Sequence, residues 1–382
     1  MSRTPFFIVA GLAVLLFAWV VNRGPGPADA PSSVAGPDAP TGVDGTPSSA
    51  SGGSPQAKMA REAWRRAKGS FAVAGAEPEP PPALLDWVDR MLNHQASSPV
   101  TQEDVDRWFE SGHTNAGDLL AARQVGEDAR YLTNALERFP NDPRVLIATT
   151  VWKDGPEAHR ERLARFKAAA PDNALADYLS AWNEFQAGNP EKALADLAAA
   201  TQKKGFDDYT KDAMQTAEEL LLSAGRSPAE AKAVGSTTTL LPHLSHLRKL
   251  SQNIAELQGQ YIAAGDQESA VRLARTGIHL GNQLTEGGGS QTMIGELVGI
   301  AVQKTVVTSL PGDATYDFLQ GEPATYQSRL MERRAALREG TPNLATWIRT
   351  ANEADILQYF DRYRAEGESA AMKWLREQTK AP

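Results

Sequence analysis

The stretch that decides the fold is Leu240–Gly277, which reads LLPHLSHLRKLSQNIAELQGQYIAAGDQESAVRLARTG. Apolar residues recur at intervals of three and four positions before the pair Gly265-Asp266. This spacing is typical of an α-helix that buries one face, and the glycine-aspartate pair is typical of a turn between helices. The segment therefore predicts two neighbouring helices. The apolar stripe of the first one comprises Leu240, Leu244, Leu247, Leu250, Ile254, Leu257 and Tyr261.

The same pattern continues on both sides of this stretch. After Gln56 the chain is rich in Ala, Leu, Glu, Lys, Arg and Gln, which are strong helix formers. Short turn signals separate the helical stripes, and no run alternates apolar and polar residues as a β-strand would. We therefore predict an all-α fold in which successive antiparallel helix pairs form a solenoid. Further stripes are Leu84, Val88, Met91 and Leu92; Leu132, Leu136 and Phe139; and Leu175, Tyr178, Leu179, Trp182 and Phe185.

Two windows resemble the tetratricopeptide repeat. Ala181–Ala200 (AWNEFQAGNPEKALADLAAA) has small residues at Ala181, Ala193 and Ala200 and a glycine at the turn. Leu257–Gly277 has Tyr261, Gly265-Asp266, Ala270 and Gly277 at matching offsets, and Ala135–Pro140 (ALERFP) resembles the end of a further repeat. The resemblance implies a solenoid of helical hairpins whose small residues let paired helices approach closely.

The N-terminal residues predict a membrane anchor. Phe6–Val21 (FFIVAGLAVLLFAWVV) carries no charge and approaches the length that spans a hydrocarbon core. We favour an uncleaved transmembrane helix within residues 1–23. A cleaved signal peptide is the alternative, but its cleavage pattern, Ala28-Asp29-Ala30, is followed directly by Pro31. Arg3 precedes the span and Arg23 follows it, and we expect the folded domain on the non-cytoplasmic side of a bacterial inner membrane.

The remaining chain divides into four segments. Residues 24–56 are almost wholly Gly, Pro, Ala, Ser, Asp and Thr, so they predict a disordered linker. We expect an N-terminal helical segment at 57–140, repeat-like helices at 141–310 and capping helices at 311–382. In the last segment, two amphipathic helices around Gly367 are expected to cover the end of the solenoid.

Composition excludes several classes of function. The net charge of −8 comes without a basic run, so nucleic acid is not an expected partner. The absence of cysteine excludes disulfides, thiolate nucleophiles and cysteine-ligated metals. No phosphate loop, dinucleotide fingerprint, metalloprotease motif or GxSxG elbow is present, and no cofactor is predicted.

Few residues stand out as candidates for a site. His243 and His246 lie three positions apart on one helix face, where two ligands of a metal would stand, but no third ligand completes the motif. Gly287-Gly288-Gly289-Ser290 opens a helix and could present N–H groups to an anion. Without the lysine of a phosphate loop, the simpler interpretation is a loop whose Ser290 caps the helix.

Glu296 is an acid in the most apolar helix after the linker, Met293–Ile300. If it faces inward it needs a partner, either Lys304 or an arginine from another helix. It could instead mark the polar edge of the helix, or take part in catalysis. Gly295 and Gly299 are expected to permit close helix packing.

The stretch Leu240–Leu310, with LPHLSHLRKL and LTEGGGSQTMIGELVGIAVQ, is similar to a part of uncharacterised proteins from planctomycete and verrucomicrobial bacteria. This resemblance implies a bacterial source and no particular activity. From the predicted solenoid and the anchor we expect a membrane-tethered scaffold that binds a protein or peptide through its helical-repeat surface. The alternative is an enzyme of the cell envelope with an unrecognised helical active site.

Overall fold

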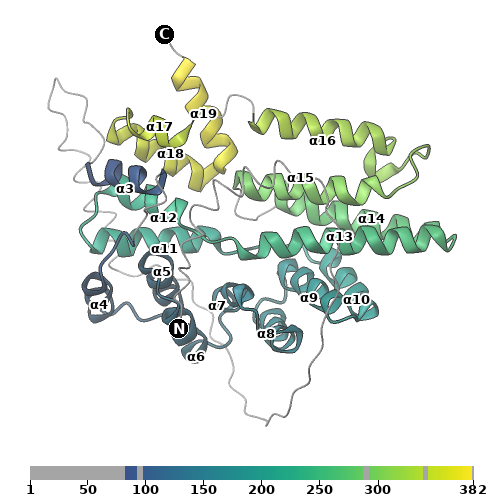
Figure 1. The fold of residues 1–382 in the computed structure, drawn as a ribbon, viewed down its shortest axis with the longest axis horizontal. Coiled ribbons are helices and arrows are strands. Elements are labelled where there is room, and N and C mark those ends of the chain that lie inside the picture. The colour runs from purple at the N-terminus through teal and green to yellow at the C-terminus, as the bar shows by residue number, and fades with distance from the viewer. Residues whose placement is uncertain (1–81, 93–97, 287–291, 339–342, 381–382) are drawn as a thin grey trace, which may run out of the picture. The chain divides into compact units, whose positions relative to one another are not determined.

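The computed structural model describes residues 82–92, 98–286, 292–338 and 343–380, and its regular elements are all helices (Figure 1). The prediction of an all-α fold is therefore confirmed for these residues, where the only β-type pairing consists of two isolated bridges. The first helices are α3 (Pro82–Leu92), α4 (Gln102–Glu110), α5 (Ala116–Gly126), α6 (Arg130–Arg138), α7 (Pro143–Ala148) and the 3-10 helix η1 (Thr149–Val151). The middle helices are α8 (Pro156–Ala169), α9 (Ala174–Gln186), α10 (Pro190–Gln202), α11 (Thr210–Ser223), α12 (Pro228–Thr237), α13 (Pro242–Ala263) and α14 (Gln267–Thr285). The last helices are α15 (Met293–Thr308), the 3-10 helix η2 (Asp317–Leu319), α16 (Pro323–Arg338), α17 (Leu344–Ile348), α18 (Glu353–Glu366) and α19 (Glu368–Lys380).

The stretch that predicted the fold forms the hairpin of α13 and α14. Gly265 adopts a positive φ of 80° at the turn, which only glycine adopts without strain. The Asp266 side chain then accepts a hydrogen bond from the Ser269 N–H and caps α14. The predicted stripe of α13 faces the core: its members Leu244, Leu247, Leu250 and Ile254 are buried.

Prolines stand at the start of several helices, and four of them end turn signals of the sequence: Pro140–Pro143, Asp154–Pro156, Ala187–Pro190 and Gly225–Pro228. Pro143, Pro156, Pro190, Pro228 and Pro242 each stand in the first turn of α7, α8, α10, α12 and α13, respectively. Proline lacks the N–H that has no intrahelical acceptor at this position, and its fixed φ suits a helix. The turn signals that contain the first four of these prolines therefore mark helix starts correctly, whereas α13 begins at Pro242, after Leu240 of the predicted stripe.

Two hydrophobic clusters form the interior. Cluster 1 joins α3, α4, α5 and α6 to α11, α12, α17, α18 and α19. Cluster 2 joins α8, α9 and α10 to α13, α14 and α15. The two clusters meet at α7, where Val145 belongs to cluster 1 and Leu146 and Ile147 belong to cluster 2.

The order of the helices in space differs from their order in the sequence. The hairpin α9–α10 packs beside the hairpin α13–α14, with α9 against α13, although α11 and α12 separate them in the chain. Helices α11 and α12 pack instead with α5 and α18. The C-terminal helices around Gly367 thus cover α12 and other members of cluster 1, a position that the sequence order does not suggest.

Helices α14 and α15 pack side by side, with glycines at their contact (Figure 1). A Cβ at Gly281 would lie 2.9 Å from the Gly299 oxygen, and one at Gly299 would lie 2.8 Å from the Gly281 oxygen. A Cβ at Gly277 would lie 2.6 Å from Val306 Cγ1. The expectation that Gly299 permits close packing is confirmed. The Gly295 N–H donates a hydrogen bond to the hydroxyl of Thr292, the N-cap of α15.

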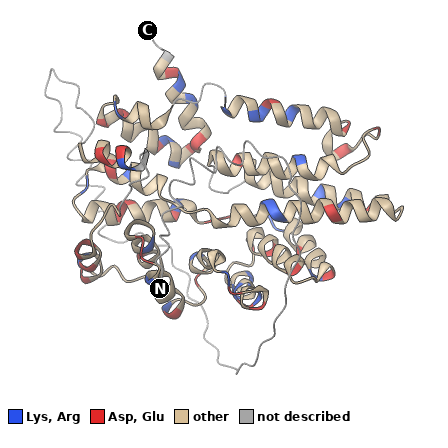
Figure 2. Ribbon diagram, in the orientation of Figure 1, with Lys and Arg blue, Asp and Glu red and all other residues tan. Residues whose placement is uncertain are grey.

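The predicted anchor at residues 1–23 and the linker at 24–56 lie outside the described residues. Within the ranges that the structure describes, no helix combines the length and the apolar character that a membrane span requires. Figure 2 shows acidic and basic residues interspersed along these helices.

Candidate functional site

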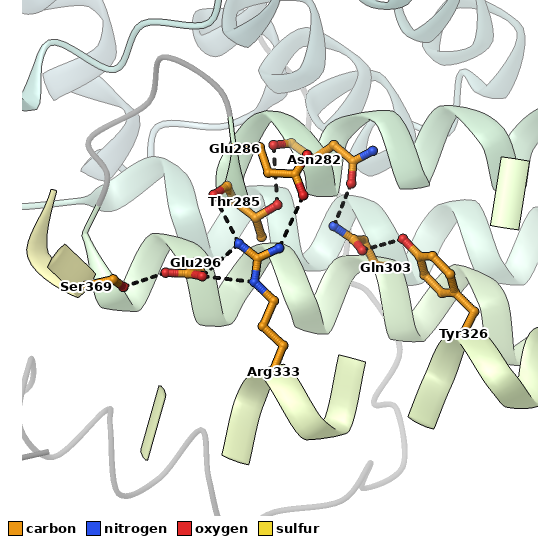
Figure 3. Close-up of polar contacts among 8 residues, drawn as sticks. All are labelled: Asn282, Thr285, Glu286, Glu296, Gln303, Tyr326, Arg333 and Ser369. Carbon is orange, nitrogen blue, oxygen red and sulfur yellow. Dashed lines mark hydrogen bonds and ion pairs between the residues drawn. The ribbon is translucent and has the colours of Figure 1, made fainter. Parts of the chain in front are cut away.

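Glu296 lies in a polar network between α15, α16 and α19 (Figure 3). Arg333 of α16 donates from Nε and Nη2 to Glu296 Oε1, at 3.0 and 2.8 Å, and the Ser369 hydroxyl donates to Oε2 at 2.6 Å. The Glu296 side chain is 15% exposed, so this pairing offsets much of its lost hydration. An arginine from another helix is therefore its partner, while the Lys304 ammonium approaches Met331 instead.

Arg333 also connects this network to α14. Its guanidinium donates to the Thr285 backbone oxygen at 3.3 Å and to Glu286 Oε1 at 3.2 Å. In the same region Gln303 of α15 donates to Asn282 Oδ1 at 3.0 Å and accepts from the Tyr326 hydroxyl at 2.6 Å (Figure 3). These hydrogen bonds join four helices: α14, α15, α16 and α19. The groups that make them therefore have a structural role.

A second carboxylate stands beside Glu296. Glu368 Oε2 accepts a hydrogen bond of 2.6 Å from the Met293 N–H, at the start of α15. Burial raises the pKa of Glu368, the hydrogen bond from Met293 opposes this, and the nearby Glu296 carboxylate raises the pKa further. Neither acid lines the groove or the cavity described below. We therefore assign the two acids to the contact between α15 and α19.

The two histidines of the metal hypothesis point to different partners. His243 Nε2 lies 3.2 Å from Asp208 Oδ2, and both side chains are almost fully buried. His246 stacks on Trp182, with ring centroids 3.9 Å apart and an interplanar angle of 17°. In the described part of the chain, no group of three or more His, Cys, Asp or Glu residues is placed to hold a metal ion. The pair therefore gains no third ligand there.

The glycine-rich loop, residues 287–289, lies outside the described residues together with Ser290. Helix α15 begins at Met293, and the Thr292 hydroxyl accepts a hydrogen bond of 3.0 Å from the Gly295 N–H. The expectation that Ser290 caps this helix is wrong, because Thr292 is the N-cap.

A groove of about 800 Å³ lies between α10 and α14. Its floor and walls include Leu194 and Leu197 of α10, Tyr261 of α13, and Val271 of α14. It exists because α9 packs on α13 while the second helices of the two hairpins, α10 and α14, make only a small contact. We name this opening the α10–α14 groove.

Cationic and unsatisfied polar groups lie along one side of the α10–α14 groove. Arg272 is paired with Glu268 at 2.7 Å, whereas Arg275 has no carboxylate partner within the described ranges and lies over the Phe318 ring. His279 Nε2 is buried and has no hydrogen-bond partner among the same residues. Burial lowers the pKa of His279, so its ring is neutral near pH 7.

A smaller cavity, of about 80 Å³, lies at the junction of the two clusters and is lined by Arg123, Asp208 and His243 among others. The sequence pattern did not single out Arg123. The feature that could have revealed Arg123 is its position as a charged residue within the largely apolar run Leu119–Val125, as with Glu296 in its helix.

Comparisons of the chain with models of protein families, with curated proteins and with solved structures give no match. Function must therefore be inferred from the geometry of these openings and from the sequence.

Proposed function

We propose that the chain is a membrane-tethered interaction scaffold that binds a peptide segment of a partner protein in the α10–α14 groove. The observation that carries this proposal is the size of the groove, which exceeds the junction cavity about tenfold in volume. A groove between helices that is partly apolar and open to solvent is suited to bind a peptide segment.

The arrangement of the hairpins supports a tetratricopeptide-like solenoid. The windows that resemble this repeat, Ala181–Ala200 and Leu257–Gly277, fall on α9–α10 and α13–α14, which are neighbours in space. Small residues lie at the contacts within these hairpins, where Ala181, Ala193 and Ala270 are buried. The planctomycete and verrucomicrobial resemblance adds a bacterial source to this proposal.

The charges of the groove specify the kind of peptide. Arg275 offers an uncompensated guanidinium beside the apolar side chains of Leu194 and Val271. We therefore propose a partner segment that places an acidic residue next to apolar ones.

The test is a selection of random peptides on the full chain in lipid nanodiscs, followed by measurement of Kd for the enriched peptides. Ala198 is exposed and lines the groove, so Ala198→Trp fills the groove without changing the core. We expect this variant to weaken binding at least about tenfold, which corresponds to about 1.4 kcal/mol. Arg275→Glu is expected to weaken the binding of acidic peptides by a similar factor.

The matched control is Ala199→Trp, an exposed neighbour on the same helix that does not line the groove. It should bind the peptides as the unchanged chain does. Equal affinities for Ala198→Trp and Ala199→Trp would refute the groove as the binding site.

The anchor is a separate part of the proposal. We expect an intact-mass measurement of the mature chain to show that residues 1–30 are retained and that the protein sediments with membranes. A mass that lacks these residues would favour the secreted alternative.

A further inference from the structure

The junction cavity brings together walls from both hydrophobic clusters. Leu120 on α5 packs against cluster 1, and Ile147 on α7 belongs to cluster 2. The start of α11 and the start of α13 close the other sides, with Thr210 and His243. Ligand sites are frequent where two packed bodies meet, because a space remains between their surfaces.

Arg123 is an uncompensated cation in this cavity. Its guanidinium is half-buried and makes no hydrogen bond, ion pair or ring contact with any of the residues that the structure describes. Burial lowers its pKa, yet arginine stays charged at all physiological pH values. A cation without a counter-charge at the wall of a cavity attracts an anion that enters the cavity.

The other charged groups of the cavity are already compensated or reach solvent. Arg144 is held by Asp142 through two contacts, of 3.0 and 2.7 Å. Burial alone would raise the pKa of Asp208, but the hydrogen bond and charge of His243 lower it on balance. Asp212 is exposed and attracts Arg144. Arg123 is thus the group that lacks a partner.

The backbone at the cavity wall is strained. Tyr209 has φ 57° and ψ 18°, in the left-handed region that non-glycine residues seldom adopt. A hydrogen bond of 2.8 Å from its N–H to Asp207 Oδ1 holds this conformation. Such strain costs on the order of 1–3 kcal/mol and clusters at ligand sites. It is an observation independent of the charge of Arg123.

We propose that this cavity binds a short-chain carboxylic acid as its anion, with the carboxylate paired to the Arg123 guanidinium. The planar fork of the guanidinium fits a carboxylate with two parallel hydrogen bonds. One water-sized group needs at least about 10–15 Å³. The cavity volume of about 80 Å³ therefore holds about five to eight non-hydrogen atoms of a ligand. The carbon chain lies against Leu120 and Ile147, which are apolar.

The experiment is isothermal titration calorimetry of the full chain with sodium acetate and sodium lactate at constant ionic strength. Sodium chloride and sodium phosphate serve as the comparison anions. We expect lactate or acetate to bind at least about tenfold more tightly than chloride, and Arg123→Gln to lose at least about tenfold of that affinity. Arg107→Gln, which changes an exposed arginine of α4, is the matched control.

A second readout separates a ligand site from a structural role of Arg123. In buffer without carboxylates, Arg123→Gln removes an uncompensated charge and should unfold at a urea concentration equal to or above that of the unchanged chain. A loss of stability in that buffer, unchanged acid binding by Arg123→Gln, or carboxylate binding no tighter than chloride would each overturn the proposal. Peptide binding in the α10–α14 groove is measured independently. The proposal for the groove and the proposal for the cavity can therefore be refuted separately.

Discussion

Replacing Gly281 with alanine should lower the free energy of unfolding by about 3 kcal/mol. The new Cβ would lie 2.2 Å from Gln303 Cγ and 2.9 Å from the Gly299 oxygen. Gln303 cannot move aside freely, because Asn282 and Tyr326 hold its amide through hydrogen bonds. The substitution must therefore separate α14 from α15 or break these bonds. Urea unfolding followed by circular dichroism measures the change.

Gly259→Ala is the matched control for this substitution. Gly259 lies within α13, and a Cβ there would meet nothing within 4 Å. Alanine favours a helix over glycine by about 1 kcal/mol, so this variant should be slightly more stable than the unchanged chain. If both variants unfold at the same urea concentration, the glycine contact does not limit the approach of α14 and α15.

The second large effect depends on pH and on His246. Burial, followed by the charge of Lys249, lowers the pKa of His246 from 6.5 to about 4. Between these pH values the unfolded chain binds more protons than the folded one, so stability falls as the pH is lowered through this window. The shift corresponds to about 3 kcal/mol, lost by pH 4. His246→Phe keeps an aromatic ring on Trp182 and removes this titration.

We therefore expect the difference in stability between His246→Phe and the unchanged chain to grow as the pH falls from 6.5 to 4. Urea unfolding at several pH values within this window measures it, and the subtraction removes the contributions of other titrating groups. Lys249→Gln is the control, because it removes only the smaller cause and should retain most of the pH dependence. Parallel pH profiles for His246→Phe and the unchanged chain would contradict the assignment.

Local features of the fold could be predicted from the sequence. The stripe that includes Leu247 and Ile254, the turn at Gly265 and the prolines that begin helices all depend on neighbouring residues. Their physical causes are periodic burial and backbone conformation, which a single segment determines. The all-α fold follows from these features alone.

The position of each helix in space could not be predicted in the same way. Helices α11 and α12 leave the row of hairpins because their apolar faces fit α5 and α18, which lie far away in the sequence. The need of Glu296 for a partner was predictable, but Arg333 was one of many possible arginines. Arg123 and Asp208 line one cavity only because both clusters meet there. Contacts of this kind depend on the whole packing.

The composition of cluster 1 has a consequence for how the chain acquires its structure during synthesis. Its members run from Leu84 to Leu375, whereas those of cluster 2 run from Leu146 to Leu319. On the ribosome the second cluster can close while the last helices are still being made, but the first must wait for nearly the complete polypeptide. Contacts between such distant residues form slowly, and apolar surface left open attracts other chains. A stop codon just before α18 would therefore leave the face of α12 that packs against α18 uncovered, although α12 is translated well before α18.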